Sequence, residues 1–233
     1  MYRVSDWYTS LACFTFPTVF IHLSPEEIET VATGTTNGPD VTRIQERISR
    51  ALPHIRGSAF IHADVCTPTD SATFKEHKGA IRSGERGWTM LVESDKVKGA
   101  FAEGLTERIC LHSYRRMEPI REFRAFVRNR KIVAMSQMKL NRHYGRLNGR
   151  REEIWTKGQR LIVEIANKLP ADDLVIDLYL TSAGDYMIID MNLWGEPTDP
   201  LLLRTWDRDW SEELGLKLIE KPTKLGGEVQ VSF

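Results

Sequence analysis

The stretch Tyr186-Met187-Ile188-Ile189-Asp190-Met191-Asn192-Leu193-Trp194-Gly195-Glu196 indicates the fold of this chain most clearly. Its apolar run ends in an acid and an amide, and side chains alternate between faces along a strand, so Asp190 and Asn192 point the same way. An earlier apolar run, Leu174–Leu180, carries one acid, Asp177. Three oxygen-bearing side chains can thus converge, which is the ligand chemistry that Mg²⁺ prefers beside water and nucleotide phosphate.

A turn-rich connection between these two runs predicts a hairpin. We expect Thr181 to pair with Tyr186, with residues 182–185 as the loop, which sets Asp177 opposite Asp190. A register that differs by one residue would turn Asp177 to the other face. Two carboxylates across a ladder repel each other, and a bound divalent cation would remove that repulsion. The alternative is that Asp177 lies at a sheet rim and Asp190 merely ends a strand.

The composition excludes several classes of protein. The 233 residues include 32 lysines and arginines and 32 acids, and this zero net charge argues against a general nucleic-acid binder. The three cysteines (Cys13, Cys66 and Cys110) have no zinc-ligand or redox spacing, which favours a reducing compartment. We see no signal-peptide layout and no apolar run that could span a bilayer. We therefore expect a cytoplasmic protein without a membrane partner.

Strands and helices are mixed along the chain, and hairpins rather than steady strand–helix alternation favour the α+β class. A capping box at Ser24 and Glu27 predicts a helix start. The glycine- and cation-rich stretch Lys75–Arg86 reads as a surface loop that could close over phosphates. The expected strands cover 18–23, 59–65, 89–92, 109–114, 122–127, 131–137 and 174–180, and a last strand-like segment covers 186–196. The expected helices follow the N-cap candidates Ser24, Asp40 and Ser94, and a fourth helix covers residues 151–169 and ends before Pro170.

Several segments, in order, are similar to motifs of the cell division cycle protein 123 family of ATP-grasp proteins. The clearest is Glu122-Phe123-Arg124-Ala125-Phe126-Val127 followed by Ser136-Gln137, which resembles that family's Glu-Phe-Arg-x-Phe-Val…Ser-Gln hairpin. Each piece is weak alone, but the ordered set is specific and covers most of the chain. The other matching segments are Ser5–Tyr8, residues 59–72 with Pro68 and Asp70, residues 175–177, residues 189–192 and residues 198–203.

The resemblance implies an ATP-grasp-like fold of two lobes with antiparallel sheets and a nucleotide site between them. We expect residues 1–57 to pack on the core as an N-terminal segment. Residues 58–118 would form the N-lobe, and residues 119–233 the C-lobe with the metal-binding hairpin and a C-terminal tail. The short chain suggests a compact bacterial or viral member.

The resemblance also implies roles for individual residues. Asp177, Asp190 and Asn192 would hold Mg²⁺ against the phosphates of ATP, and Arg124 would contact phosphate as the catalytic residue. The alternative for Arg124 is an ion pair with Glu122 on its own strand. The resemblance implies two further roles. Asp70 would organise the site, and backbone groups of the strand edge from Leu111 to Tyr114 would contact the adenine.

One departure concerns phosphate charge. The family carries lysine or arginine at the position matched by His62, and a second lysine where this chain has Val92 or Glu93. His62 is either a phosphate contact or simply a partly buried histidine. Replacement cations could come from Lys75–Arg86, Arg115, Arg116, Arg121 or Lys139.

Three functions remain open on this basis. The first is a Mg²⁺- and ATP-dependent ligase that joins a carboxylate to an amine of unknown identity. The second is a nucleotide-dependent assembly factor, because eukaryotic members of the family promote assembly of translation initiation factor 2 by holding its gamma subunit. In that case the tail Thr198–Trp210, with its apparently exposed leucines and tryptophans, could dock the partner. The third is a binding module that has lost catalysis.

Overall fold

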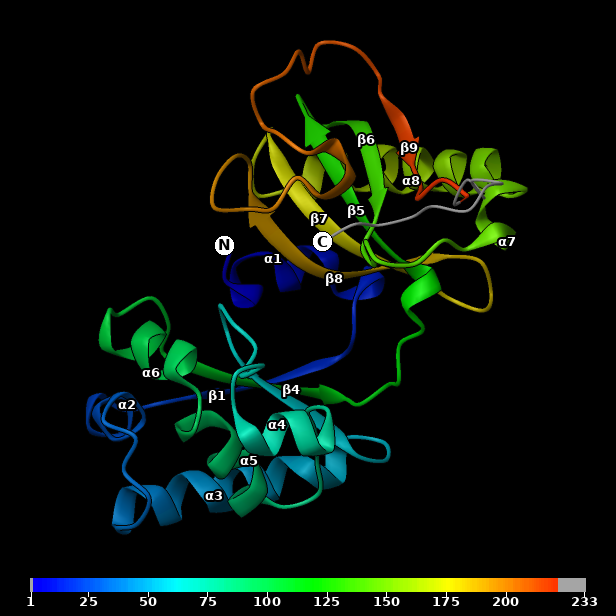
Figure 1. Ribbon diagram of the computed structural model, residues 1–233. Helices are drawn as coiled ribbons and strands as arrows, with labels where there is room; N and C mark the ends of the chain where they lie inside the picture. Colours follow the sequence, from blue (N-terminus) through cyan, green and yellow to red (C-terminus); the bar gives the residue numbers. More distant parts are fainter. Residues whose placement is uncertain (1, 222–233) are drawn as a thin grey trace, which may run out of the picture.

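The computed structural model describes residues 2–221, which form two lobes joined by two connections, one from α1 to β1 and one from β4 to β5 (Figure 1). The N-lobe sheet has the strand order β1-β4-β2-β3, and the C-lobe sheet has the order β8-β7-β5-β6-β9. No helix among these residues is long and apolar enough to cross a membrane. The last twelve positions of the expected C-terminal tail, 222–233, lie outside the described residues.

The N-lobe is an antiparallel sheet whose helices pack together on one side of it (Figure 1). One core lies between the sheet and a covering helix. It fully buries Ile61 of a central strand and Ile44 and Ile48 of the helix. The strands are β1 (Thr18–His22), β2 (Ala59–Ala63), β3 (Ala80–Ile81) and β4 (Arg108–Ser113). The helices are α2 (Pro25–Ala32), α3 (Pro39–Ala51), α4 (Ala72–His77), α5 (Gly84–Val92) and α6 (Asp95–Ala102).

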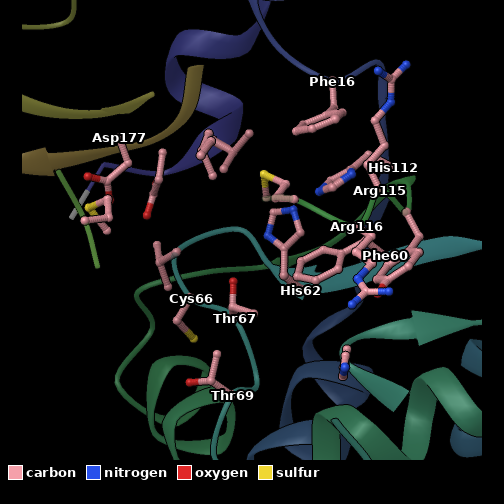
Figure 2. Close-up of a pocket in the computed structure, with 18 of the residues that line it drawn as sticks. Phe16, Phe60, His62, Cys66, Thr67, Thr69, His112, Arg115, Arg116 and Asp177 are labelled. Carbon is pink, nitrogen blue, oxygen red and sulfur yellow. The ribbon is translucent and has the colours of Figure 1, made fainter. Parts of the chain in front are cut away.

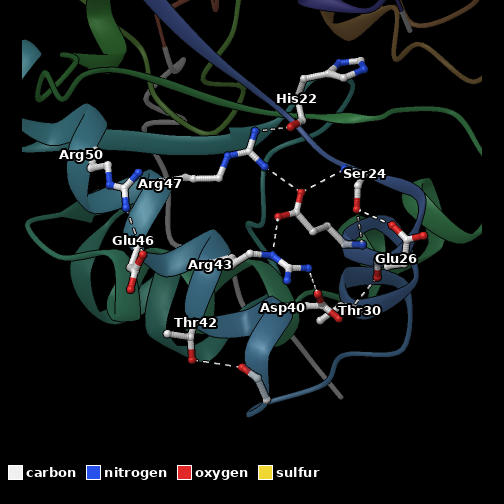
Figure 3. Close-up of polar contacts among 12 residues, drawn as sticks. His22, Ser24, Glu26, Thr30, Asp40, Thr42, Arg43, Glu46, Arg47 and Arg50 are labelled. Atoms are coloured by element: carbon white, nitrogen blue, oxygen red, sulfur yellow. Dashed lines mark hydrogen bonds and ion pairs between the residues drawn. The ribbon is translucent and has the colours of Figure 1, made fainter.

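The predicted capping box is confirmed and extends into a buried ion pair (Figure 3). The Ser24 side chain accepts from the backbone N–H of Glu27, and the Glu27 carboxylate accepts from the backbone N–H of Ser24. The same carboxylate accepts from Arg47 Nη1 of α3 at 2.7 Å. A buried charge is tolerated only when it is paired, so this cluster fixes α2 against α3.

The C-lobe sheet is covered on one face by α8 and α1, which bury Phe123, Ile176 and Ile188 beneath them. Its helices are α1 (Val4–Leu11), α7 (Gly145–Asn148) and α8 (Arg151–Ile165). Its strands are β5 (Glu122–Arg128), β6 (Lys131–Gln137), β7 (Leu174–Leu180), β8 (Tyr186–Leu193) and β9 (Gly215–Lys217). Short 3₁₀ turns cover Ala12–Phe14, Leu52–His54, Pro119–Arg121, Ala166–Lys168 and Leu201–Leu203.

The hairpin of β7 and β8 pairs Asp177 with Asp190 as expected, but by another route. At the turn, Tyr186 pairs with Leu180 and not with Thr181, so the predicted turn register is wrong by one residue. The register shifts between Asp177 and Leu178, where Ile189 is the extra residue of a β-bulge. The pairing at the turn alone would leave Asp190 out of register with Asp177 and on the other face of the sheet. The extra residue in the bulge shifts the register by one and so brings the two acids opposite each other.

Three expectations for the N-lobe are wrong. Residues 89–92 form the end of α5, because Ser83 caps a helix that begins upstream and the short apolar run continues it. Lys75–Arg86 is not an open loop, since α4, β3 and the start of α5 occupy it. The expected boundary at residue 58 also cuts through the lobe, because β1 pairs with β4 in the same sheet.

The tail covers the other face of the C-lobe sheet. Trp210 is 4% exposed and Leu203 is 3% exposed, and both pack with Phe126. Trp194, Trp206 and Trp210 lie against one another with ring centroids 4.8 to 5.3 Å apart. The expectation of an exposed apolar tail is therefore wrong for these residues, whose side chains pack against the sheet.

Candidate functional site

A cavity of about 700 Å³ lies between the two lobes (Figure 2). The N-lobe contributes Phe60 and His62 from β2 and His112 from β4, while β7 and β8 contribute Asp177 and Asp190. Figure 2 shows Asp177 at one end, Arg115 and Arg116 at the other, and aromatic rings between them. The cavity is therefore divided into regions of different chemistry.

The N-lobe wall of the cavity is a stack of flat rings. The ring of His112 lies between those of Phe16 and Phe60, with centroids 4.7 and 5.0 Å away and small interplanar angles. His62 stands beside this stack, 5.6 Å from His112 between ring centroids. Alternation along β2 explains the arrangement, because Phe60 and His62 face the cavity while Ile61 enters the core.

Both histidines are placed to be uncharged near neutral pH. Burial, followed by the neighbouring His62, lowers the pKa of His112 to about 4. Burial likewise lowers the pKa of His62. In each ring Nδ1 lies within hydrogen-bond distance of a backbone oxygen, that of Ala63 at 2.7 Å or that of Ser113 at 3.0 Å. This wall therefore offers aromatic surface rather than positive charge to a ligand.

The C-lobe wall is built around Asp177, which is 8% exposed. Arg124 on β5 donates to both of its carboxylate oxygens, from Nε at 2.7 Å and from Nη2 at 2.8 Å. The amide of Asn192 donates to Asp177 Oδ2 at 3.3 Å. Arg124 also donates to the backbone oxygen of Asp199, so the pair connects the site to the tail. The predicted alternative partner, Glu122, is not the one that Arg124 contacts.

Asp190 is the acid of this wall without a cationic partner within 4.0 Å among the described residues. Its Oδ1 accepts from its neighbour's backbone N–H, that of Met191, at 2.8 Å. Burial, followed by repulsion from Asp177, raises the pKa of Asp190 to about 7. Its carboxyl group faces the cavity and would gain most from a cation placed beside it.

The donor set fits Mg²⁺ by its chemistry. Asp177, Asp190 and Asn192 supply hard oxygen atoms, and a cation would offset the burial and the repulsion from Asp177 that raise the pKa of Asp190. Within residues 2–221 no three His, Cys, Asp or Glu side chains gather as a metal cluster, and this group has two acids and one amide. Arg124 would have to share or release Asp177 for that carboxylate to bind the ion.

The far end of the cavity carries the cations. Lys78, Arg115 and Arg116 line it, and they come from two of the regions expected to replace the missing lysines. Arg115 lies over the ring of Phe16, with its guanidinium carbon 5.9 Å from the centroid. An anionic group would be held here rather than on the histidine wall.

The remaining predicted residues lie in different places. Leu111 has a fully buried side chain, and its strand pairs with β1 on one side and β2 on the other, so the expectation of a free strand edge there is wrong. Tyr114 lies just beyond the strand and lines the cavity. Asp70 accepts from Ser94 Oγ at 2.5 Å and from the Lys96 backbone N–H, which anchors the loop that precedes it.

Lys139 is exposed and is not among the residues that line the cavity. Burial and then Asp177 raise the pKa of Glu122, whereas Lys139 lowers it, so Lys139 acts on this neighbouring acid. Sequence reasoning missed Phe16, Phe60 and His112. Alternation with His62 could have indicated Phe60, whereas His112 joins them only through the pairing of β2 with β4.

The N-terminal segment links the two lobes beside the cavity. Asp64, 1% exposed at the end of β2, accepts from the backbone N–H of Ser5 at 2.8 Å and from its hydroxyl at 2.5 Å. Arg108 donates to the same hydroxyl at 2.6 Å. Because Ser5 lies on α1, whose Trp7 packs in the C-lobe core, the contact joins one lobe to the other.

Comparison with known proteins gives related sequences in eukaryotes. A protein of Xenopus laevis named translation initiation factor eIF2 assembly protein is 27% identical over 218 residues, covering 85% of this chain and 61% of its own length. Its namesake from Ajellomyces capsulatus is 34% identical over 112 residues, covering 47% of this chain and 25% of its own length. This chain thus spans about three fifths of the length of the frog relative. These organisms give no support to the suggested bacterial or viral origin.

The solved structure of Cdc123 from Schizosaccharomyces pombe has a similar fold. It superposes with a TM-score of 0.74 at 20% identity, covering 94% of this chain and 95% of the other. The predicted α+β class, with two lobes of mostly antiparallel strands, is confirmed, and the fold is like that of Cdc123. The family model described as D123 matches residues 24–224, so the chain belongs to the D123 family.

Proposed function

We propose that this protein is an assembly factor for a translation initiation factor 2-type complex and that it binds Mg²⁺-ATP between its lobes. The observation that carries the proposal is the similarity over 85% of the chain to a relative named for eIF2 assembly. Docking of the partner through the tail Thr198–Trp210 belongs to the same proposal. Leu203 and Trp210 of that tail are buried. Polar groups of the tail would therefore make the contact with the partner.

The nucleotide part of the proposal is supported by the division of the cavity. Asp177, Asp190 and Asn192 would hold Mg²⁺, which would neutralise phosphate charge when bound. Arg124 offers a planar guanidinium beside the same group and would contact a phosphate after releasing Asp177. Because Phe16 and Phe60 cover the two faces of His112, this ring wall would meet a base mainly through ring edges.

The assembly role is tested by affinity capture. The purified gamma subunit of eukaryotic initiation factor 2 is passed over the immobilised chain, with and without Mg²⁺-ATP, and bound protein is quantified. Retention of the subunit, stronger with nucleotide, is the expected result. Failure to retain it in both conditions, from a chain shown to be folded by circular dichroism, would refute the assembly role.

The nucleotide role is tested separately by calorimetry with ATP, with and without Mg²⁺. Binding that depends on Mg²⁺ supports it, and heat that is the same with and without the metal contradicts it. Ligation of a carboxylate to an amine is a second candidate, favoured by the cations Lys78, Arg115 and Arg116, which could hold an anionic acceptor. Phosphate release that requires an added acid and amine would identify this activity, and binding without any release would leave a binding module.

A further inference from the structure

A second cavity, of about 460 Å³, lies beside the connection between the lobes and is separate from the cleft except for Pro119, which lines both. One side of it is formed by Glu118, Pro119 and Ile120, and the other by residues 142–146 at the start of α7. The proposed function uses none of its side chains. It combines apolar surface from Ile120 and Tyr144 with the side chains of Arg142 and Arg146.

The chain around this cavity is strongly basic. Residues 139–151 contain Lys139, Arg142, Arg146, Arg150 and Arg151 and no acid. Within the described part of the chain, neither Arg142 nor Arg146 has a carboxylate within 4.0 Å, and the Arg142 guanidinium carbon lies 5.4 Å from the ring centroid of Tyr144. The one acid that lines the cavity, Glu118, already pairs with Arg121 at 3.2 Å. Positive charge is therefore available at this surface.

The basic segment is held in place rather than merely exposed. Gln137, 1% exposed, donates from Nε2 to the backbone oxygens of Lys139 at 2.6 Å and Arg142 at 2.9 Å. Its Oε1 accepts from the backbone N–H of Ile219 at 3.0 Å. His143 Nδ1 lies 2.8 Å from the backbone oxygen of Ile219. A preorganised segment loses little conformational entropy when a ligand binds, which is how rigid sites gain affinity.

We propose that this cavity is a docking site for an acidic, extended protein segment that inserts an apolar side chain between Ile120 and Tyr144. Guanidinium groups bind carboxylates with strong and directional hydrogen bonds, so Arg142 and Arg146 would hold the acids on either side of that side chain. The apolar slot between Ile120 and Tyr144 suits the side chain of an amino acid and would have no counterpart in a polyphosphate strand. The site rests on the proposed function in that it would receive part of a protein partner.

Fluorescence anisotropy tests the proposal with a labelled peptide in which Glu and Leu alternate. The test variant is the double substitution Arg142→Glu and Arg146→Glu. The matched control is Arg56→Glu with Arg160→Glu, which makes the same charge change at exposed arginines elsewhere. We expect the test variant to lose on the order of tenfold in affinity and the control to lose little. Thermal unfolding of both variants verifies that the fold is intact.

Three results would overturn the proposal. Equal losses in both double variants would mean that net charge alone attracts the peptide. Equal binding of a Gln–Leu peptide would show that the arginines recognise no carboxylate. Displacement of the peptide by a single-stranded RNA at lower concentration than by unlabelled peptide would assign the surface to nucleic acid. Capture of the gamma subunit and calorimetry with Mg²⁺-ATP report on the proposed function independently, since the peptide assay uses neither.

Discussion

The two walls of the central cavity differ in how they handle charge. The N-lobe wall buries two histidines in a neutral form against Phe16 and Phe60. The C-lobe wall brings two acids together and neutralises only one of them, Asp177, with an arginine. A wall of neutral rings offers no charge to phosphates, whereas a wall with an unpaired acid would be stabilised by a cation. For the proposed nucleotide site, the difference favours a metal ion over histidine as the carrier of positive charge beside the phosphates.

The ion pair of the C-lobe wall gives the largest expected effect. Arg124 and Asp177 have side chains that are each 11% exposed, so Arg124→Leu leaves a buried carboxylate without its partner. We expect the free energy of unfolding, measured by urea denaturation, to fall by about 3 kcal/mol. The exposed pair of Arg130 and Asp172 is the control, and Asp172→Ala should cost about 1 kcal/mol or less.

This prediction has its own internal check. The double variant Arg124→Leu with Asp177→Leu removes both charges and should recover a large part of the lost stability. A double variant that is less stable than Arg124→Leu alone would mean that the pair contributes more than charge compensation.

The metal role of the same wall predicts the next effect. Asp190→Asn keeps the size of the side chain and removes its charge, and we expect the affinity for Mg²⁺-ATP to fall on the order of 100-fold, as measured by calorimetry. His62→Phe, on the opposite wall, should change this affinity only a few-fold, because the histidine it replaces is neutral. The reverse ranking of the two variants would assign the phosphates to the N-lobe.

The contribution of Asp190, on the C-lobe wall, to the stability of the folded chain should decrease as the pH rises. The pKa of Asp190 is raised to about 7, above its value in the unfolded chain, so the folded state binds more protons between about pH 4 and 7. Stability from this group is full below about pH 4 and is lost as the pH passes 7. Asp190→Asn should therefore be more stable than the natural chain at pH 8, with little difference at pH 4, by urea denaturation without added metal.

The contribution of His112, on the N-lobe wall, to stability should instead decrease as the pH falls. The pKa of His112 is lowered to about 4, so its contribution is present above about pH 6.5 and is lost as the pH falls through 4. His112→Phe should make the acid side of the stability profile shallower by at most one proton, or about 1.4 kcal/mol per pH unit. An unchanged slope would show that His112 is solvated in the folded chain.

The sequence predicted what depends on neighbouring residues. The capping box of Ser24 and Glu27, the two C-lobe hairpins and the pairing of Asp177 with Asp190 follow from local spacing. The bulge at Ile189 did not, because a regular ladder that starts from Thr181 and Tyr186 already sets Asp177 opposite Asp190, and no local signal indicates that Tyr186 pairs with Leu180 instead.

Contacts between distant segments account for most of the other errors. His112 reaches His62 only because β4 lies between β1 and β2, and β9 adds to the C-lobe sheet as three residues with no alternation to reveal them. The alternative to phosphate binding by Arg124 was an ion pair with Glu122 on its own strand, but its partner lies on β7, which the ladder places beside β5. Strand order thus decided which charges meet.

A crystal structure with Mg²⁺ and a non-hydrolysable ATP analogue tests the central claim most directly. The account predicts an ion bound by Asp177 and Asp190, with the phosphates at that wall and Arg124 turned from Asp177 toward them. A nucleotide whose phosphates lie on the His62 and His112 wall, with the bidentate pair of Arg124 and Asp177 intact, would contradict it.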